Sequence, residues 1–215
     1  MSIKSAIAAL SLKVKIIIAC TVIAVAGGIT AAVVLTSGGT DAYRVLKVFE
    51  LTGSAVISRE GAGDIDAYVG MNLESGDTLT VGEDSTLRLS LDGDKYVLLD
   101  SGTVLELIAE GTPNDSRTSI LLKQGTILNE LTTSLSANSS YEVSTPKATM
   151  AVRGTSFMVS VEQDEDGSYI IRTNTFHGKV QVILLDADGN PTDETAMVSE
   201  GKGIIIKTEP NSETG

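Results

Sequence analysis

Four oxygen-bearing side chains near the C-terminus have the types and the spacing to hold a metal ion. They are Asp186, Asp188, Asn190 and Asp193. Oxygen ligands at alternating positions suit Ca²⁺, so calcium is the metal that this segment predicts. The spacing departs from an EF-hand loop, however, and the same residue types are typical of a hairpin turn. We favour the turn, keep calcium as the alternative, and expect no cofactor.

A catalytic constellation is harder to assemble from this chain. The sequence contains one histidine, His177, and one cysteine, Cys20. Neither a Ser-His-Asp triad nor a two-histidine metal site can be built around His177, which precedes a glycine in an expected turn. The sequence also lacks a nucleophile elbow, a zinc-protease helix motif and a phosphate-binding loop. We therefore predict that the protein is not an enzyme.

The charge of the chain is divided unevenly. The 215 residues carry a formal net charge of −12. The first 40 residues contain only Lys4, Lys13 and Lys15 as charged residues, so the rest of the chain carries −15. Phosphate contacts dominate the affinity of proteins for nucleic acids, and this acidic balance therefore argues against a nucleic-acid partner.

An apolar segment follows these lysines and predicts a membrane anchor. Residues 16–36 are uncharged, and a helix of the 20 residues from Ile16 to Leu35 would span roughly 30 Å, the hydrocarbon thickness of a bilayer. Lys13 and Lys15 lie on its N-terminal side, so residues 1–15 are expected in the cytoplasm. The sequence thus predicts a single-pass protein of the cell membrane whose C-terminal part is extracytoplasmic.

Two alternatives to this anchor stay open at the level of sequence. A cleavable signal peptide would have a shorter apolar region and a small-residue cleavage site. Lipidation of Cys20 would need an apolar run before the cysteine, whereas here the run follows it. We favour Cys20 as a small apolar residue of the helix, which leaves no cysteine for a disulfide in the exported part.

The exported part alternates apolar and polar residues with period two, which is typical of strands with one buried face. Thr86–Leu91 follows this pattern, as does Phe157–Val161, and Asp-Gly pairs such as Asp92-Gly93 predict hairpins. We expect an all-β domain over 45–208, either a β-solenoid-like coil or a two-layer sandwich. Residues 37–44 would be a linker and residues 209–215 a flexible tail.

One block within this domain is unusually specific. It extends from Val143 to Phe157 with the sequence VSTPKATMAVRGTSF, and its most distinctive positions are Thr145, Pro146, Arg153, Gly154 and Thr155. The block resembles the signature of the FecR domain, a run of the type V-x-T-P-x-A-x-x-x-V-R-G-T-x-F. Further features of that family lie in the expected order along 45–208. They are Gly53–Val56 with Arg59, the Gly76-Asp77 turn, the strands within Ser85–Leu91 and Tyr96–Leu99, and Gly178–Val182.

Each signature residue also has a physical role that does not depend on the family. Pro146 favours an extended residue before it and suits a strand edge or bulge. Gly154 permits a turn or a close backbone approach. Arg153, if its head is buried, needs a carboxylate or carbonyl partner. Asp77 is expected to cap its own loop. We favour a folding motif that sets a tight corner, with a ligand or partner site as the alternative.

The resemblance implies a bacterial signalling protein with an extracytoplasmic sensory or protein-interaction domain that binds a partner in the cell envelope. In the iron-dicitrate branch of the family, a cytoplasmic region before the span controls a sigma factor. Residues 1–15 are fewer than a globular anti-sigma domain needs, so the sigma-factor role is not carried over as an expectation. Sigma-factor control through residues 1–15 and a purely structural surface or cell-wall role are the alternatives.

Overall fold

The structure is a computed structural model that describes residues 44–208, and every regular element in this range is a β-strand. The prediction of an all-β domain is therefore confirmed, with fifteen strands in chain order. Within residues 44–208, no helix is long and apolar enough to cross a membrane. The anchor predicted at 16–36, most of the linker predicted at 37–44 and the tail predicted at 209–215 lie outside the described residues.

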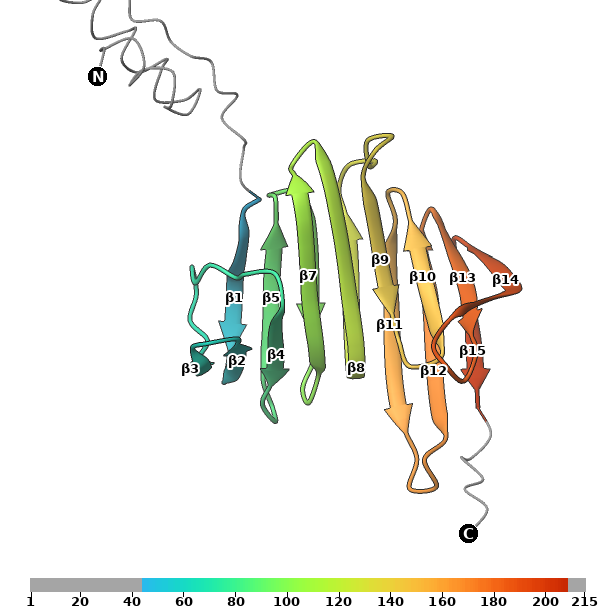
Figure 1. The fold of residues 1–215 in the computed structure, drawn as a ribbon, viewed down its shortest axis with the longest axis horizontal. Coiled ribbons are helices and arrows are strands. Elements are labelled where there is room, and N and C mark those ends of the chain that lie inside the picture. Colours follow the sequence, from blue (N-terminus) through green and yellow to red (C-terminus); the bar gives the residue numbers. More distant parts are fainter. Residues whose placement is uncertain (1–43, 209–215) are drawn as a thin grey trace, which may run out of the picture. The chain divides into compact units, whose positions relative to one another are not determined.

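The strands form two sheets that share one long strand, β8 (Figure 1). Sheet A contains, in spatial order, β1 (Leu46–Thr52), β5 (Thr86–Leu91), β6 (Lys95–Leu99), the second half of β8 (Asp115–Leu131), β11 (Ser156–Gln163), β12 (Tyr169–His177) and β15 (Lys202–Lys207). Sheet B contains β3 (Gly63–Asp66), β2 (Ala55–Arg59), β4 (Asp77–Val81), β7 (Val104–Thr112), the first half of β8, β9 (Ser140–Ser144), β10 (Ala148–Val152), β13 (Lys179–Leu185) and β14 (Pro191–Ser199).

The chain crosses repeatedly from one sheet to the other, so both sheets grow in the same direction along the domain. Figure 1 shows this as a progression of colour from β1 at one end to β15 at the other. The repeated crossing resembles the path of a solenoid. The pairing is nevertheless mostly antiparallel: among the described strands only β8 and β9 are parallel neighbours.

Period-two patterning accounts for the core between the sheets. Leu87 and Leu89 in sheet A and Ile120 and Leu122 in sheet B are fully buried members of one hydrophobic cluster. In these strands the side chains between the buried positions point away from the core. The apolar face predicted for Phe157–Val161 is buried as expected.

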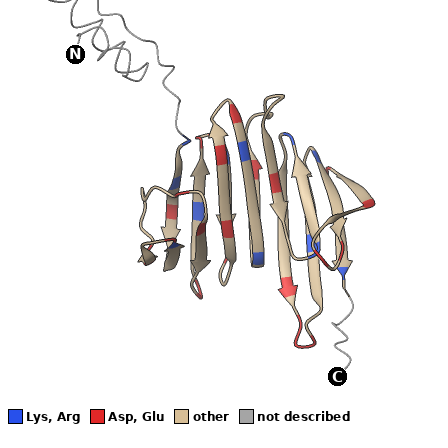
Figure 2. Cartoon of the chain, viewed as in Figure 1, with Lys and Arg blue, Asp and Glu red and all other residues tan. Residues whose placement is uncertain are grey.

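Three predicted Asp-Gly hairpins are present, at Asp92-Gly93, Asp166-Gly167 and Asp188-Gly189. Asp92 and Gly93 both have positive φ, 57° and 78°, as mirror-image hairpin turns require. Acidic residues gather at exposed hairpin tips such as the loop between β11 and β12 (Figure 2).

The passage of β8 from sheet B to sheet A occurs at Gly125. The pattern Gly125-Thr126-Ile127 predicts a glycine that opens a strand, whereas the structure places Gly125 inside the longest strand of the domain. Its φ of +90° turns the strand from one sheet into the other. The Thr103 hydroxyl fixes this corner, because its Oγ1 donates to Thr126 O at 3.0 Å and accepts from Thr126 N at 3.1 Å.

Candidate functional site

Two motif residues from separate strands meet in a buried ion pair. Asp77, at the start of β4, is fully buried, and Arg59, at the end of β2, reaches it with one edge of its guanidinium. Nε donates to Oδ1 at 2.8 Å and Nη2 donates to Oδ2 at 2.7 Å. This hydrogen bonding to Asp77 raises the pKa of Arg59 above its ordinary value. A forked pair of this kind fixes geometry as well as charge.

The same pair ties down the loop that precedes β4. Asp77 Oδ2 accepts the backbone N–H of Glu74 at 2.8 Å, which confirms the prediction that Asp77 caps its own loop. Arg59 also donates to the carbonyl of Asn72 at 3.1 Å and to the Glu74 carboxylate at 2.6 Å. Arg59 and Asp77 both belong to motifs that the sequence shows, but the sequence does not predict that they pair. The residue spacing within each motif gives no distance between the two motifs.

The first half of the signature block is the hairpin turn between β9 and β10. Thr145 is buried, and its hydroxyl donates to Ala148 O at 2.8 Å and accepts from Ala148 N at 3.1 Å. A backbone bond from Thr145 N to Ala148 O, at 2.8 Å, completes the closure. Pro146 and Lys147 occupy the tip of this turn, where a missing N–H does not interrupt the sheet.

The second half of the block is the crossing from β10 in sheet B to β11 in sheet A. Arg153 is exposed, and its Nη2 lies 3.5 Å from Ser136 O, so the head is not buried and no carboxylate of the described chain pairs with it. Gly154 has φ +134°, and a Cβ there would lie 3.1 Å from Ser134 Cα. Thr155 is buried and donates to Lys179 O at 3.2 Å. These contacts fit the corner role, and a ligand or partner site at the block stays a prediction.

Other crossings repeat this combination of a glycine and a small hydroxyl residue. A Cβ on Gly53 would lie 2.8 Å from Ser85 Cβ, and a Cβ on Gly178 would lie 2.9 Å from Gly154 O. In the sequence, glycine precedes several strands, as at Gly53 and Gly178, for no reason that the sequence alone reveals. The structure supplies one: crossing segments of the two sheets pass too close for a side chain.

Three of the four calcium candidates, Asp186, Asp188 and Asn190, lie in the loop between β13 and β14. The Asp186 carboxylate accepts the backbone N–H groups of Asp188, at 2.9 Å, and Asn190, at 2.8 Å, as in a hairpin turn. The hydrogen bond from the Asn190 N–H lowers the pKa of Asp186. Asp193 belongs to β14, and within residues 44–208 no group of three or more His, Cys, Asp or Glu side chains is arranged to hold a metal. His177 is exposed and faces Glu200 at 3.1 Å.

A buried charge network that no sequence motif indicates lies at the first described residue, Arg44. Arg44 is 5% exposed and pairs with Asp92, 2% exposed, at 2.8 Å. Arg44 also donates to Thr118 Oγ1 and to the backbone carbonyl of Arg117, each at 2.7 Å. Lys95, equally buried, pairs with Asp94 at 2.7 Å. The Asp92-Gly93 turn, predicted only as a hairpin, is therefore also an anchoring point for the first described residue.

Tyr141 lies in the core and donates its hydroxyl to Asn129 Oδ1 at 2.7 Å. Burial raises the pKa of this phenol far above its usual range.

The stability of the domain should therefore depend on pH through Tyr141. An unfolded tyrosine loses its proton near pH 10, so above that pH the unfolded state binds fewer protons and the stability falls by about 1.4 kcal/mol per pH unit for this one group. Replacing Tyr141 with phenylalanine removes this contribution. Urea midpoints from pH 8 to 11 should fall more steeply for the parent chain than for Tyr141→Phe, and equal slopes would contradict the assignment.

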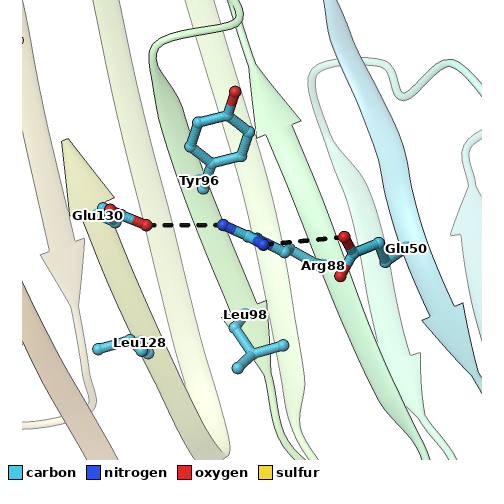
Figure 3. A pocket seen from close by; sticks show the side chains of 6 residues that line it. All are labelled: Glu50, Arg88, Tyr96, Leu98, Leu128 and Glu130. Carbon is cyan, nitrogen blue, oxygen red and sulfur yellow. Dashed lines mark ion pairs between the residues drawn. The ribbon is translucent and has the colours of Figure 1, made fainter. Parts of the chain in front are cut away.

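The most distinctive exposed feature is a cluster on the outer face of sheet A (Figure 3). The Arg88 guanidinium lies over the rings of Phe49, at 5.7 Å, and Tyr96, at 5.0 Å. Glu50 and Glu130 flank it at 3.8 and 3.6 Å. A hollow of about 260 Å³ opens here, and Leu98 and Leu128 complete its lining.

A β-bulge in β1 places both Phe49 and Glu50 on this face. Val48 pairs with Leu89 and Glu50 pairs with Arg88, so Phe49 is the extra residue of the bulged strand. Bulges re-aim side chains, and here Glu50 points outward next to Phe49, which is 40% exposed. A strictly alternating strand would have placed only one of Phe49 and Glu50 on the surface.

The cluster continues as an apolar row across three strands. Leu98, Leu128 and Met158 are register partners on β6, β8 and β11, and all three lie on the outer face. We call the set Phe49, Arg88, Tyr96, Leu98, Leu128 and Met158 the sheet A face. A comparable row on the outer face of sheet B is mostly polar: Thr78, Glu106, Leu121, Ser144 and Thr149.

The chemistry of the sheet A face suits the binding of a protein. Aromatic residues, methionine and arginine are enriched in interfaces, and tyrosine and arginine are frequent among the residues that dominate binding energy. Arg88 is already held in place by two rings and two carboxylates, so little side-chain freedom remains to be lost on binding. The sequence offered one signal for this face, namely apolar residues at the outward positions of β6, β8 and β11.

Comparisons with known proteins find one matching family and two similar crystal structures. Residues 77–181 match the model of a family described as FecR protein. The search of curated proteins found no match. Two crystal structures of a "putative anti-sigma factor" from Parabacteroides distasonis ATCC 8503, at 1.65 and 2.50 Å resolution, are similar at 17% identity and a TM-score of 0.47. The match covers 63% of this chain and 60% of each of those chains.

Proposed function

Because residues 77–181 belong to the FecR protein family, we propose that the chain is a signalling regulator whose β domain is a non-catalytic protein-interaction module of the cell envelope. The observation that carries the proposal is the sheet A face. On this face, aromatic and aliphatic side chains surround an arginine that two rings and two carboxylates already hold in place. Exposed apolar patches with a polar rim mark interaction sites.

The proposal includes a place in the cell. Residues 16–36 would cross the cytoplasmic membrane once, with residues 1–15 inside and the β domain outside. The uncharged segment and the lysines before it support this orientation. The acidic surface of the exported part would keep the domain away from anionic lipid heads, so that the sheet A face stays accessible.

Chromosomal variants in the organism of origin test the signalling role. Arg88→Ala combined with Leu98→Ser should alter the same transcripts as deletion of the gene, with the amount of protein unchanged, because the face loses its charge anchor and an apolar contact. Two exposed or half-exposed positions on the outer face of sheet B, in the variant Glu142→Ala with Thr149→Ala, provide the matched control and should leave transcripts as in the parent strain.

Two results would contradict the proposal. A gene deletion that changes no transcript would exclude a regulator. A normal transcript profile in the Arg88 and Leu98 variant, at normal protein level, would exclude the sheet A face as the working surface.

A further inference from the structure

The two edge strands of sheet A, β1 and β15, differ in whether their outer backbone groups are hydrogen-bonded. At the N-terminal end, the open side of β1 is covered by the segment 68–73, through bonds from Val48 N to Met71 O at 2.9 Å and from Leu73 N to Leu46 O at 2.8 Å. At the C-terminal end, β15 pairs only with β12 among the described strands. Alternate residues of β15 therefore turn their N–H and C=O groups away from the sheet with no described partner.

The core is open beside this free edge. A hollow of about 350 Å³ lies between the last strands of the two sheets. Its apolar lining comes from Val182 and Leu184 of β13, Ala196 of β14, and Ile204, Ile205 and Ile206 of β15, and its polar lining from Glu194, Thr195 and Lys207. Of the apolar residues, Leu184, Ala196, Ile204 and Ile206 are only partly buried. On the outer side of the same strand Ile205 is 58% exposed. An edge with free backbone groups and apolar pockets on one side is the arrangement that accepts an added strand.

The charges at the two ends of β15 indicate which kind of strand could be added to this edge. Lys202 and Lys207 stand at the two ends of β15, and both are exposed. A second copy that paired with this edge through its own β15, of sequence KGIIIK, would bring only lysines as charged residues and no carboxylate to it, and like charges brought together across strands are destabilising. A strand with acidic residues at those two places would instead form cross-strand ion pairs.

We propose that the free edge of β15 binds an extended segment of a partner protein by strand addition, with apolar side chains entering the hollow beside Ile204 and Ile206 and acidic side chains facing Lys202 and Lys207. This surface is separate from the sheet A face. The partner class is thus an extended peptide with alternating apolar residues and acidic ends.

The test uses the full chain in detergent and a labelled hexapeptide, acetyl-Glu-Val-Thr-Val-Thr-Glu-amide, whose valines would face Ile204 and Ile206. Fluorescence anisotropy should show saturable binding. Lys202→Glu combined with Lys207→Glu should weaken it at least tenfold, whereas Lys123→Glu, a charge reversal on the outer face of sheet B, should leave it unchanged. The same peptide with N-methyl groups on both threonines should not bind, because strand pairing needs those N–H groups.

Other outcomes overturn the proposal. Equal binding of the N-methylated peptide would mean that no strand pairing occurs, and equal binding by the double variant of Lys202 and Lys207 would remove the role of charge. Binding that appears only after residues 209–215 are deleted would assign the edge to the chain's own tail. Arg88→Ala should not affect the peptide, so failure at this edge can be told apart from failure of the sheet A face.

Discussion

Replacing Gly125 with alanine should destabilise the domain by about 4 kcal/mol, the sum of a strained backbone at about 1–3 kcal/mol and an overpacked contact at about 1–3 kcal/mol. Gly125 has φ +90°, a region that residues with a Cβ rarely adopt. An added Cβ would also lie 2.5 Å from Thr103 Cα, and backbone cannot move aside as a flexible side chain can. The corner that joins the two sheets would have to shift.

Urea unfolding of the purified chain measures this loss. Gly189→Ala is the matched control, because Gly189 has a similar φ of +83° but no atom within 4 Å of the added Cβ. The control should lose only the free energy that corresponds to backbone strain, about 1–3 kcal/mol. Equal losses at the two positions would show that the contact with Thr103 has no energetic weight, and would contradict the account of this corner.

Replacing the fully buried Asp77 with alanine should cost about 3–5 kcal/mol, because it removes the forked hydrogen bonds and leaves the partly buried guanidinium without its main partner. Arg59 would keep the Asn72 carbonyl and the exposed Glu74 carboxylate as acceptors, and the backbone N–H of Glu74 would lose its own acceptor. The loop before β4 should loosen together with the pair. Urea midpoints and amide exchange of residues 72–77 report the two effects separately.

The double variant Arg59→Met with Asp77→Leu distinguishes a lost contact from an unpaired charge. Removal of both charges should recover most of the loss, since a buried pair replaced by apolar residues is often close to neutral. Asp193→Ala, an exposed aspartate on β14, is the control and should change stability by about 0.5 kcal/mol or less. A double variant as unstable as Asp77→Ala would contradict the pairing account.

Much of the fold follows from sequence. Period two in Thr86–Leu91 and Phe157–Val161, together with the Asp-Gly turns, was sufficient for an all-β domain with the correct inward faces. What remained undecided was the path of the chain. Strand alternation fixes which side chains are buried, but it says nothing about which sheet a strand joins, and the single strand β8 belongs to both.

The candidate site could be predicted less well from the sequence than the fold. The signature block drew attention to Thr145–Thr155, whereas the structure gives that block hydrogen bonds that close a turn and a corner. The sheet A face depends on a bulge at Phe49 and on cross-strand register between Leu98, Leu128 and Met158. Pairing register is a tertiary property that one strand's sequence does not specify. The buried Arg44–Asp92 pair was missed for the same reason.

Site-specific photo-cross-linking in the organism of origin tests the central claim most directly. A photoreactive residue at Leu98, in the middle of the sheet A face, should join the full chain to an envelope protein, and Arg88→Ala should reduce that product without changing the amount of chain. The same residue at Glu142, on the outer face of sheet B, should give no such product. Equal cross-linking from both positions, or none from Leu98, would contradict the claim that sheet A carries the partner-binding surface.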